Sequence, residues 1–188
     1  MREFLNLNNP DKILDPVFAL LGNAGVNNGK GSIADPDCLQ QAVADQAFTN
    51  AKAVEDVNGA VNALIFRTLE RNTGAVGQKS TLCTSIHAKN PEISALKQHQ
   101  DPASDGAAAT NRAITLELAK QIKSVGGDPL DAIKSGTFSP GYIGDPTAKG
   151  STCNDENDAQ GCIFTLNLLI PDATEAEILA VCGSLPSL

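Results

Sequence analysis

The sequence predicts an all-α fold, a compact multi-helix bundle with one long irregular, disulfide-stapled loop near the C-terminus. Apolar residues recur at helical spacing, Asp–Pro and Asn–Pro pairs mark helix starts, and Gly, Pro and polar residues crowd the stretch 136–161. A chain of 188 residues has the size of one ordinary domain. We therefore expect residues 1–188 to form a single helical domain, with 136–161 as its long loop.

Proline follows an acidic or amide residue at most of its positions. Seven of the ten prolines come directly after Asp or Asn. The Asx side chain can cap a helix while proline occupies the first helical position, where no N–H donor is needed. Asp35–Pro36, Asn90–Pro91 and Asp128–Pro129 each precede a helix-like stretch, although such pairs also open plain turns.

Apolar spacing and these start signals together predict eight helical segments. They cover residues 11–21, 36–52, 57–71, 81–87, 91–98, 107–125, 128–135 and 174–182. The face that the first of them should bury holds Leu14, Val17, Phe18 and Leu21. The clearest segment is 107–125, because Ile114, Leu118 and Ile122 repeat at helical spacing.

The end of the chain combines an ambiguous apolar run with a clear helix start. Residues 163–170 are either a short strand or a buried helix. Thr174 and Glu177 then match a capping box, which predicts a last helix ending near Cys182.

The five cysteines favour disulfide bonds. None forms a C-x-x-C pair, which argues against a zinc ribbon or thioredoxin-like chemistry. Cys153 and Cys162 bracket a polar loop that a bridge would staple, and Cys38 with Cys83 is the second expected pair. Cys182 would stay free or pair with another chain. The alternative is five reduced, buried thiols in a cytosolic protein.

Charge and hydropathy exclude several partners. The net charge is −8 with a pI near 4.6, and no Lys/Arg cluster offsets it, so we expect no nucleic-acid partner. No apolar run is long enough to span a membrane. No signal peptide begins at Met1. The chain is therefore either cytosolic or a mature secreted form with an added start methionine.

Three motifs suggest chemistry, and each fails in detail. Residues 25–32 resemble a phosphate loop, but the first glycine and the hydroxyl residue are missing. Cys83 and His87 have metal-ligand spacing on a helix, but two ligands do not make a site. The loop 154–158 lacks the glycine and the bidentate glutamate of a calcium loop. The sequence therefore predicts no catalytic residue, no metal ligand set and no cofactor.

The long loop 136–161 is the first place to look for a functional surface, because loops of this length are uncommon without a role. It holds Tyr142, the only tyrosine of the chain. This side chain is either exposed or part of a lid packed on the core, and the sequence favours the lid.

The chain combines helices rich in Ala, Asn, Asp and Gly with few aromatic residues and with the segments 101–111 and 150–153. In these features it resembles small secreted proteins of filamentous fungi, including cell-wall and spore-surface proteins. The resemblance implies a surface or host-interaction role, and it transfers no functional residue to this chain.

These observations favour a secreted or cell-wall helical protein that acts by binding or surface coating, without catalysis, on a surface or protein partner that the sequence does not identify. One alternative is a helical carrier of a small apolar ligand such as a lipid. Another is a hydrolase-type enzyme whose site assembles distant carboxylates with His87 or His99. A cytoplasmic location is the alternative compartment.

Overall fold

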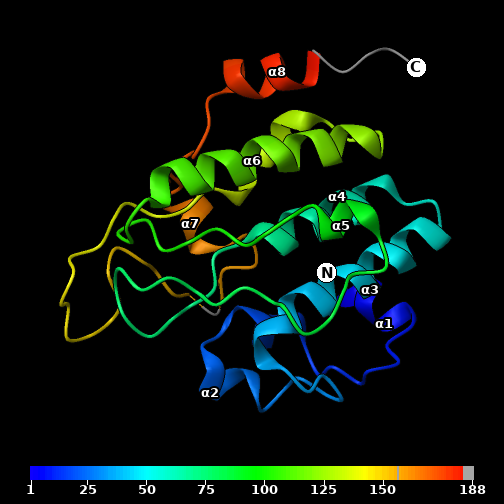
Figure 1. Ribbon diagram of the computed structural model, residues 1–188, viewed down its shortest axis with the longest axis horizontal. Helices are drawn as coiled ribbons and strands as arrows, with labels where there is room; N and C mark the ends of the chain where they lie inside the picture. The colour runs from blue at the N-terminus through cyan, green and yellow to red at the C-terminus, as the bar shows by residue number, and fades with distance from the viewer. Residues whose placement is uncertain (156, 184–188) are drawn as a thin grey trace.

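The computed structural model describes residues 1–155 and 157–183, and these residues confirm the predicted all-α fold (Figure 1). They form eight α-helices and three short 3₁₀ helices. No β-strand occurs among them, and the single antiparallel bridge joins Thr137 to Ile170. No helix in the described part of the chain is long and apolar enough to cross a membrane.

The centre of the core is a helical hairpin crossed by a third long helix. Helix α3 (Leu39–Ala53) packs against α4 (Val57–Thr68), and α4 in turn contacts α6 (Ala107–Ser124). Their facing apolar side chains are fully buried: Leu39, Val43, Phe48, Leu64, Leu118 and Ile122. Removing this apolar surface from water is the main force that holds the three helices together.

Two elements extend the core beyond α6. The 3₁₀ helix η3 (Pro129–Ser135) and the last helix α8 (Glu175–Gly183) both contact α6 and each other. The predicted capping box of α8 is confirmed, because the Thr174 N–H donates to Glu177 over 2.8 Å while the Glu177 N–H donates back to the Thr174 hydroxyl over 3.3 Å. Arg112 of α6 also pairs with Glu177 at 2.7 Å.

The predicted helix over residues 11–21 was wrong. The first helix is α1 (Arg2–Leu7), and within 11–21 only the 3₁₀ helix η1 (Pro16–Leu20) forms. Proline disfavours a helical conformation in the residue before it, and the Asp15 carboxylate caps the N–H of Val17, so the turn starts at Pro16. Leu14 and Val17, expected inside, are 67% and 51% exposed.

The predicted helix over residues 81–87 is also absent. Its backbone carbonyls accept hydrogen bonds from buried side chains of the core instead of from the next turn. The carbonyl of Thr81 accepts from Gln98 over 2.8 Å, and that of Ile86 accepts from Gln41 over 3.0 Å. The segment therefore runs along the surface of α3 without helical bonds of its own.

The helix predicted at 91–98 is shorter than expected. Helix α5 (Pro91–Ser94) is one turn long, and the chain then continues as a buried irregular segment. The backbone N–H of His99 donates to the carbonyl of Thr68 at the end of α4, over 2.8 Å. This bond draws the chain across the end of α4 instead of along a helix.

The apolar run 163–170 is neither a strand nor a buried helix. It begins as the short helix α7 (Cys162–Thr165), and Phe164, Leu166 and Ile170 are 40%, 62% and 44% exposed. The bridge from Ile170 to Thr137 is the only strand-like pairing among the described residues. The run therefore lies at the surface, beside the start of the long loop.

The structure contains the disulfides Cys38–Cys83 and Cys153–Cys162, which are the pairs expected from the sequence. The first ties the start of α3 to the irregular segment 81–87, and the second closes the end of the long loop onto α7. Cys182 is a free, buried thiol on α8, and burial raises its pKa.

Candidate functional site

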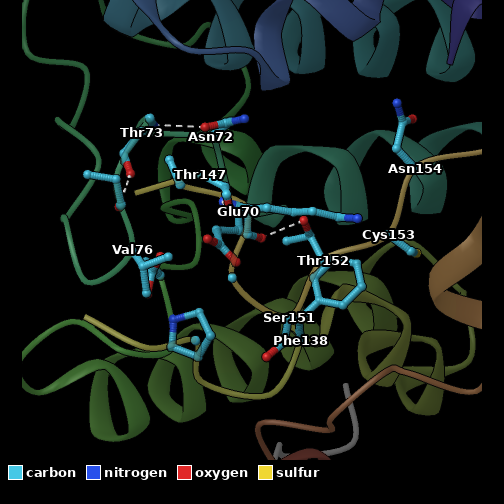
Figure 2. Close-up of a pocket in the computed structure, with 18 of the residues that line it drawn as sticks. Glu70, Asn72, Thr73, Val76, Phe138, Thr147, Ser151, Thr152, Cys153 and Asn154 are labelled. Atoms are coloured by element: carbon cyan, nitrogen blue, oxygen red, sulfur yellow. Dashed lines mark hydrogen bonds between the residues drawn. The ribbon is translucent and has the colours of Figure 1, made fainter. Parts of the chain in front are cut away.

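A cavity of about 680 Å³ lies where the long loop 136–161 faces the end of α4 (Figure 2). That volume falls within the range of roughly 300–1,000 Å³ that is usual for small-molecule sites. Its walls come from the end of η1, from the segment after α4, from Asp101 and Pro102, and from the long loop. The lining residues are Leu20, Leu21, Glu70, Asn72, Thr73, Gly74, Ala75, Val76, Asp101, Pro102, Phe138, Ser139, Gly141 and 147–154.

The long loop is held against the segment after α4 by close backbone contacts. A Cβ atom on Gly141 would lie 2.9 Å from both the Gly150 Cα and the Val76 side chain. Gly150 has φ of +57°, a left-handed conformation that other residues rarely adopt. These glycines let the two loop segments around Gly141 and Gly150 pass close to each other and to Val76, so the loop forms a wall of the cavity. In Figure 1 the corresponding yellow and cyan-green segments share one end of the molecule.

Aspartate-centred turns shape the loop in place of helices. The Asp145 carboxylate accepts from the N–H of Thr147 over 2.8 Å and from the N–H of Gly150 over 2.9 Å. The Asp158 carboxylate accepts from the N–H of Gln160 and from the Thr165 hydroxyl. Hydrogen bonding to the charged form lowers the pKa of Asp145 and of Asp158, with the neighbouring threonine hydroxyl as the largest cause in each case.

Glu70 is the titratable group with the largest functional interest in the cavity. Burial, together with the nearby charges of Asp101 and Asp172, raises its pKa to about 7. Its carboxylate makes no hydrogen bond or ion pair with any residue of the described ranges. Figure 2 shows Glu70 near the middle of the lining residues, with Asn72 and Thr73 above it and Ser151 and Phe138 below it.

His99 is fully buried and does not line the cavity. Its Nδ1 lies 2.5 Å from the carbonyl oxygen of Thr68, which can only accept, so we assign the proton to Nδ1. Its Nε2 lies 3.0 Å from the Thr115 hydroxyl and 3.7 Å from an oxygen of Asp172. Burial lowers the pKa of His99 and raises that of Asp172. This histidine is a structural group that joins α4, α6 and the segment before α8.

The two residues of the expected metal-ligand spacing do not form a site. Cys83 is consumed by its disulfide, and His87 is exposed on a segment that is not helical. No group of three potential metal ligands occurs in the described part of the chain. In the calcium-like loop, Glu156 lies outside the described residues, and Asp158 is engaged by its own turn.

Tyr142 is exposed, so the expectation of a lid packed on the core was wrong. Its side chain is 79% accessible. Gly141 on one side and Gly144, with φ of +93°, on the other let the backbone turn outward here. The neighbouring Ile143 is 66% exposed, and its side chain lies beside Gly77 of the segment after α4. Tyr142 and Ile143 do not line the cavity, and the loop contributes Phe138, Lys149 and smaller residues to its wall.

Glu70, the residue that distinguishes this cavity, was not predicted from the sequence. It stands just past the end of α4, within the stretch 57–71 that was predicted as helix, and a lone glutamate carries no spacing signal. Its importance comes from the long loop folding over it, which is a tertiary event. The phosphate-loop-like residues 25–32 do not line the cavity.

Comparison of the chain with known protein families, with curated proteins and with solved structures found no match.

Proposed function

We propose that this protein is a secreted helical binding protein that holds a small molecule in the Glu70 cavity without reacting with it. One observation carries the proposal: a cavity of about 680 Å³ is lined by a partly buried carboxylate, Glu70, that has no partner among the described residues. A partly buried carboxylate without a partner is costly, and a ligand that donates hydrogen bonds or carries a positive charge offsets that cost.

The lining indicates a ligand with both polar and apolar parts. Leu20, Leu21, Val76 and Phe138 offer an apolar wall. The Ser139 and Ser151 hydroxyls make no hydrogen bond to a described residue and face the same space as Glu70. A hydroxyl- or amine-bearing molecule fits this mixture better than a lipid chain, since burying a lipid against so many polar groups would leave them unpaired.

The disulfides support a secreted location. Such bonds form and persist in oxidising compartments, and they are rare in the cytosol. Both bridges tie down irregular segments, namely 81–87 and the end of the long loop. A cell-wall or host-interaction role is the setting in which we place the binding activity.

The proposal is tested by asking what the protein retains. Wild type, Ser151→Trp and the matched control Ser94→Trp are exposed to a small-molecule extract of the source organism, and bound compounds are identified by native mass spectrometry. Ser151 lines the cavity, whereas Ser94 lies on exposed α5. We expect wild type and Ser94→Trp to retain the same compound and Ser151→Trp to lose it. Retention of nothing by wild type, or equal retention by all three proteins, would contradict the proposal.

The pKa of Glu70 supports a second candidate, a hydrolase. A carboxyl group with a pKa of about 7 can act as a general acid or base near neutral pH, and Asp101 supplies a second carboxylate in the same cavity. Turnover of ester, glycoside or amide substrates by wild type, abolished in Glu70→Gln and retained in the surface control Glu55→Gln, would support this candidate and contradict a purely binding role.

A further inference from the structure

Two arginines are buried side by side at the end of α4. Arg67 and Arg71 are each 3% exposed. Arg67 donates only to neutral amide oxygens, those of Gln98 at 3.2 Å and Gln41 at 3.5 Å. No ion pair in the described part of the chain includes it. Burial, with the nearby charge of Arg71, lowers the pKa of Arg67 to about 10.

Arg71 is only partly compensated. Its Nη1 lies 3.2 Å from a carboxylate oxygen of Asp37 and also donates to the carbonyls of Asp37 and Thr81. Its Nε is buried and has no hydrogen-bond partner. The charge of Asp35 also acts on it from a partly exposed position. Two buried guanidinium groups therefore share one ion-paired carboxylate, an arrangement that favours a further anion.

A small cleft opens onto Arg71. Its volume is about 110 Å³, well below the roughly 300 Å³ at which sites for drug-sized molecules begin. Exposed Lys79 adds a second positive charge to its wall. The lining residues are Gly22, Asp37, Arg71, Asn72, Thr73, Gln78, Lys79, Ser80 and Thr81.

We propose that this cleft binds a single tetrahedral oxyanion, phosphate or sulfate, between Arg71 and Lys79. The guanidinium of Arg71 and the ammonium group of Lys79 supply charge-assisted donors, and Thr73, Ser80 and Thr81 line the same cleft. The anion also relieves the repulsion between Arg67 and Arg71. The Asp37 carboxylate lines the cleft as well, and its pairing with Arg71 turns it into a group that orients the guanidinium.

The site is separate in its chemistry from the Glu70 cavity. The two share Asn72 and Thr73 in their walls, but Glu70 and Asp101 line only the larger cavity, and Arg71 and Lys79 line only the smaller cleft. A test of oxyanion binding is therefore independent of the ligand proposed for the larger cavity.

The test is a titration of full-length protein with sulfate and with phosphate, at constant ionic strength against chloride, followed by the amide NMR signals of residues 71–73 and 79–81. We expect saturable shifts at these residues in wild type. Lys79→Ala should weaken binding roughly tenfold, because it removes one charge-assisted hydrogen bond. Lys120→Ala, the same substitution at a partly exposed lysine of α6 outside the cleft, should leave binding unchanged.

Lys79→Ala is the main variant because its side chain is exposed, whereas substitution of Arg71 can impair folding. Absence of saturable binding in wild type, or equal binding by wild type and Lys79→Ala, would overturn the proposal. The same titration is repeated with a phosphate monoester. If the monoester binds as tightly as inorganic phosphate, the ligand is a phosphoryl group on a larger molecule. If the monoester binds more weakly, the ligand is the free ion, and both results support the oxyanion site.

Discussion

The helical core and the long loop 136–161 reach order by different means. In α3, α4 and α6, apolar side chains at helical spacing are withdrawn from water, and Phe48, Leu64 and Leu118 are fully buried. The described part of the loop has no helix, and its largest side chain, Tyr142, points into solvent. Carboxylate-centred turns, close glycine contacts and a disulfide hold it instead.

The difference explains where the cavity lies. A core packed at native density leaves no room for a ligand. A loop that is held by backbone hydrogen bonds and covalent bonds can stand off from the core and enclose space. The loop therefore provides the walls of the binding site, and the helices fix the position of the groups, such as Glu70, that face it.

Truncating a core side chain should have the largest effect on stability. Phe48→Ala removes a fully buried ring of α3, and we expect it to lower the free energy of unfolding by about 3–5 kcal/mol. Tyr142→Ala in the loop should change it by less than about 0.5 kcal/mol. Urea denaturation followed by circular dichroism measures both. Similar losses for the two variants would show that the loop is part of the packed core.

Removal of the disulfide at the core should lower the free energy of unfolding more than removal of the disulfide in the loop. The bridge Cys38–Cys83 closes a separation of 45 residues and Cys153–Cys162 one of 9 residues. In the chain-entropy account the losses are about 4 kcal/mol and about 2.5 kcal/mol respectively. Paired Cys→Ser variants, compared by denaturation without reductant, test this. A larger loss from the shorter bridge would contradict a purely entropic role.

Stability should depend on pH through Glu70. Its pKa is raised from 4.5 in the unfolded chain to about 7 in the folded protein, so the folded state binds the proton more tightly. The contribution of Glu70 to the free energy of unfolding is therefore most favourable below pH 4.5 and falls as pH rises toward 7. Allowing for screening at a partly exposed side chain, Glu70→Gln should stabilise the protein by about 2 kcal/mol at pH 8 and leave it unchanged at pH 4.

The control for that prediction is Glu55→Gln, a surface glutamate outside the cavity. Its stability should follow wild type at both pH values. An equal gain at pH 4 and pH 8 in Glu70→Gln would mean that the effect comes from packing and that ionisation plays no part.

The smallest effects should come from single capping carboxylates, and they should differ in kind. Asp56 caps α4 through the N–H of Gly59 over 2.8 Å, so Asp56→Ala should cost about 1 kcal/mol of global stability. Asp145→Ala should leave global stability near wild type but speed hydrogen exchange at the amides of Thr147 and Gly150. Unchanged exchange at these amides would show that Asp145 does not hold the loop.

The core helices could be predicted from the sequence because the signals that specify them, apolar spacing and capping residues, lie within each helix. The repeat of Ile114, Leu118 and Ile122 predicted α6 within one residue of its observed end. The capping box at Thr174 predicted the start of α8. The failure at 11–21 was local, since Pro16 and the Asp15 cap fix where the turn starts. The failure at 81–87 came from distant partners: buried Gln41 and Gln98 satisfy the carbonyls of this segment, and no local pattern encodes that contact.

The candidate site was largely beyond prediction for the same reason. The long loop was identified from its composition, but the position of Glu70 beneath it depends on close contacts among Gly141, Gly150 and Val76. In the sequence, Arg67 and Arg71 look like two ordinary charged residues of the predicted helix 57–71. Only the folded chain shows that both are buried.

The most direct test of the central claim, that the loop and Glu70 form a binding cavity over an inert core, is an NMR screen of hydroxyl- and amine-bearing small molecules. We predict that binding compounds shift the amide signals of residues 70–76 and 147–153 in wild type and in Ser94→Trp, and fail to do so in Ser151→Trp. Shifts confined to other surfaces, or shifts that persist in Ser151→Trp, would contradict the claim.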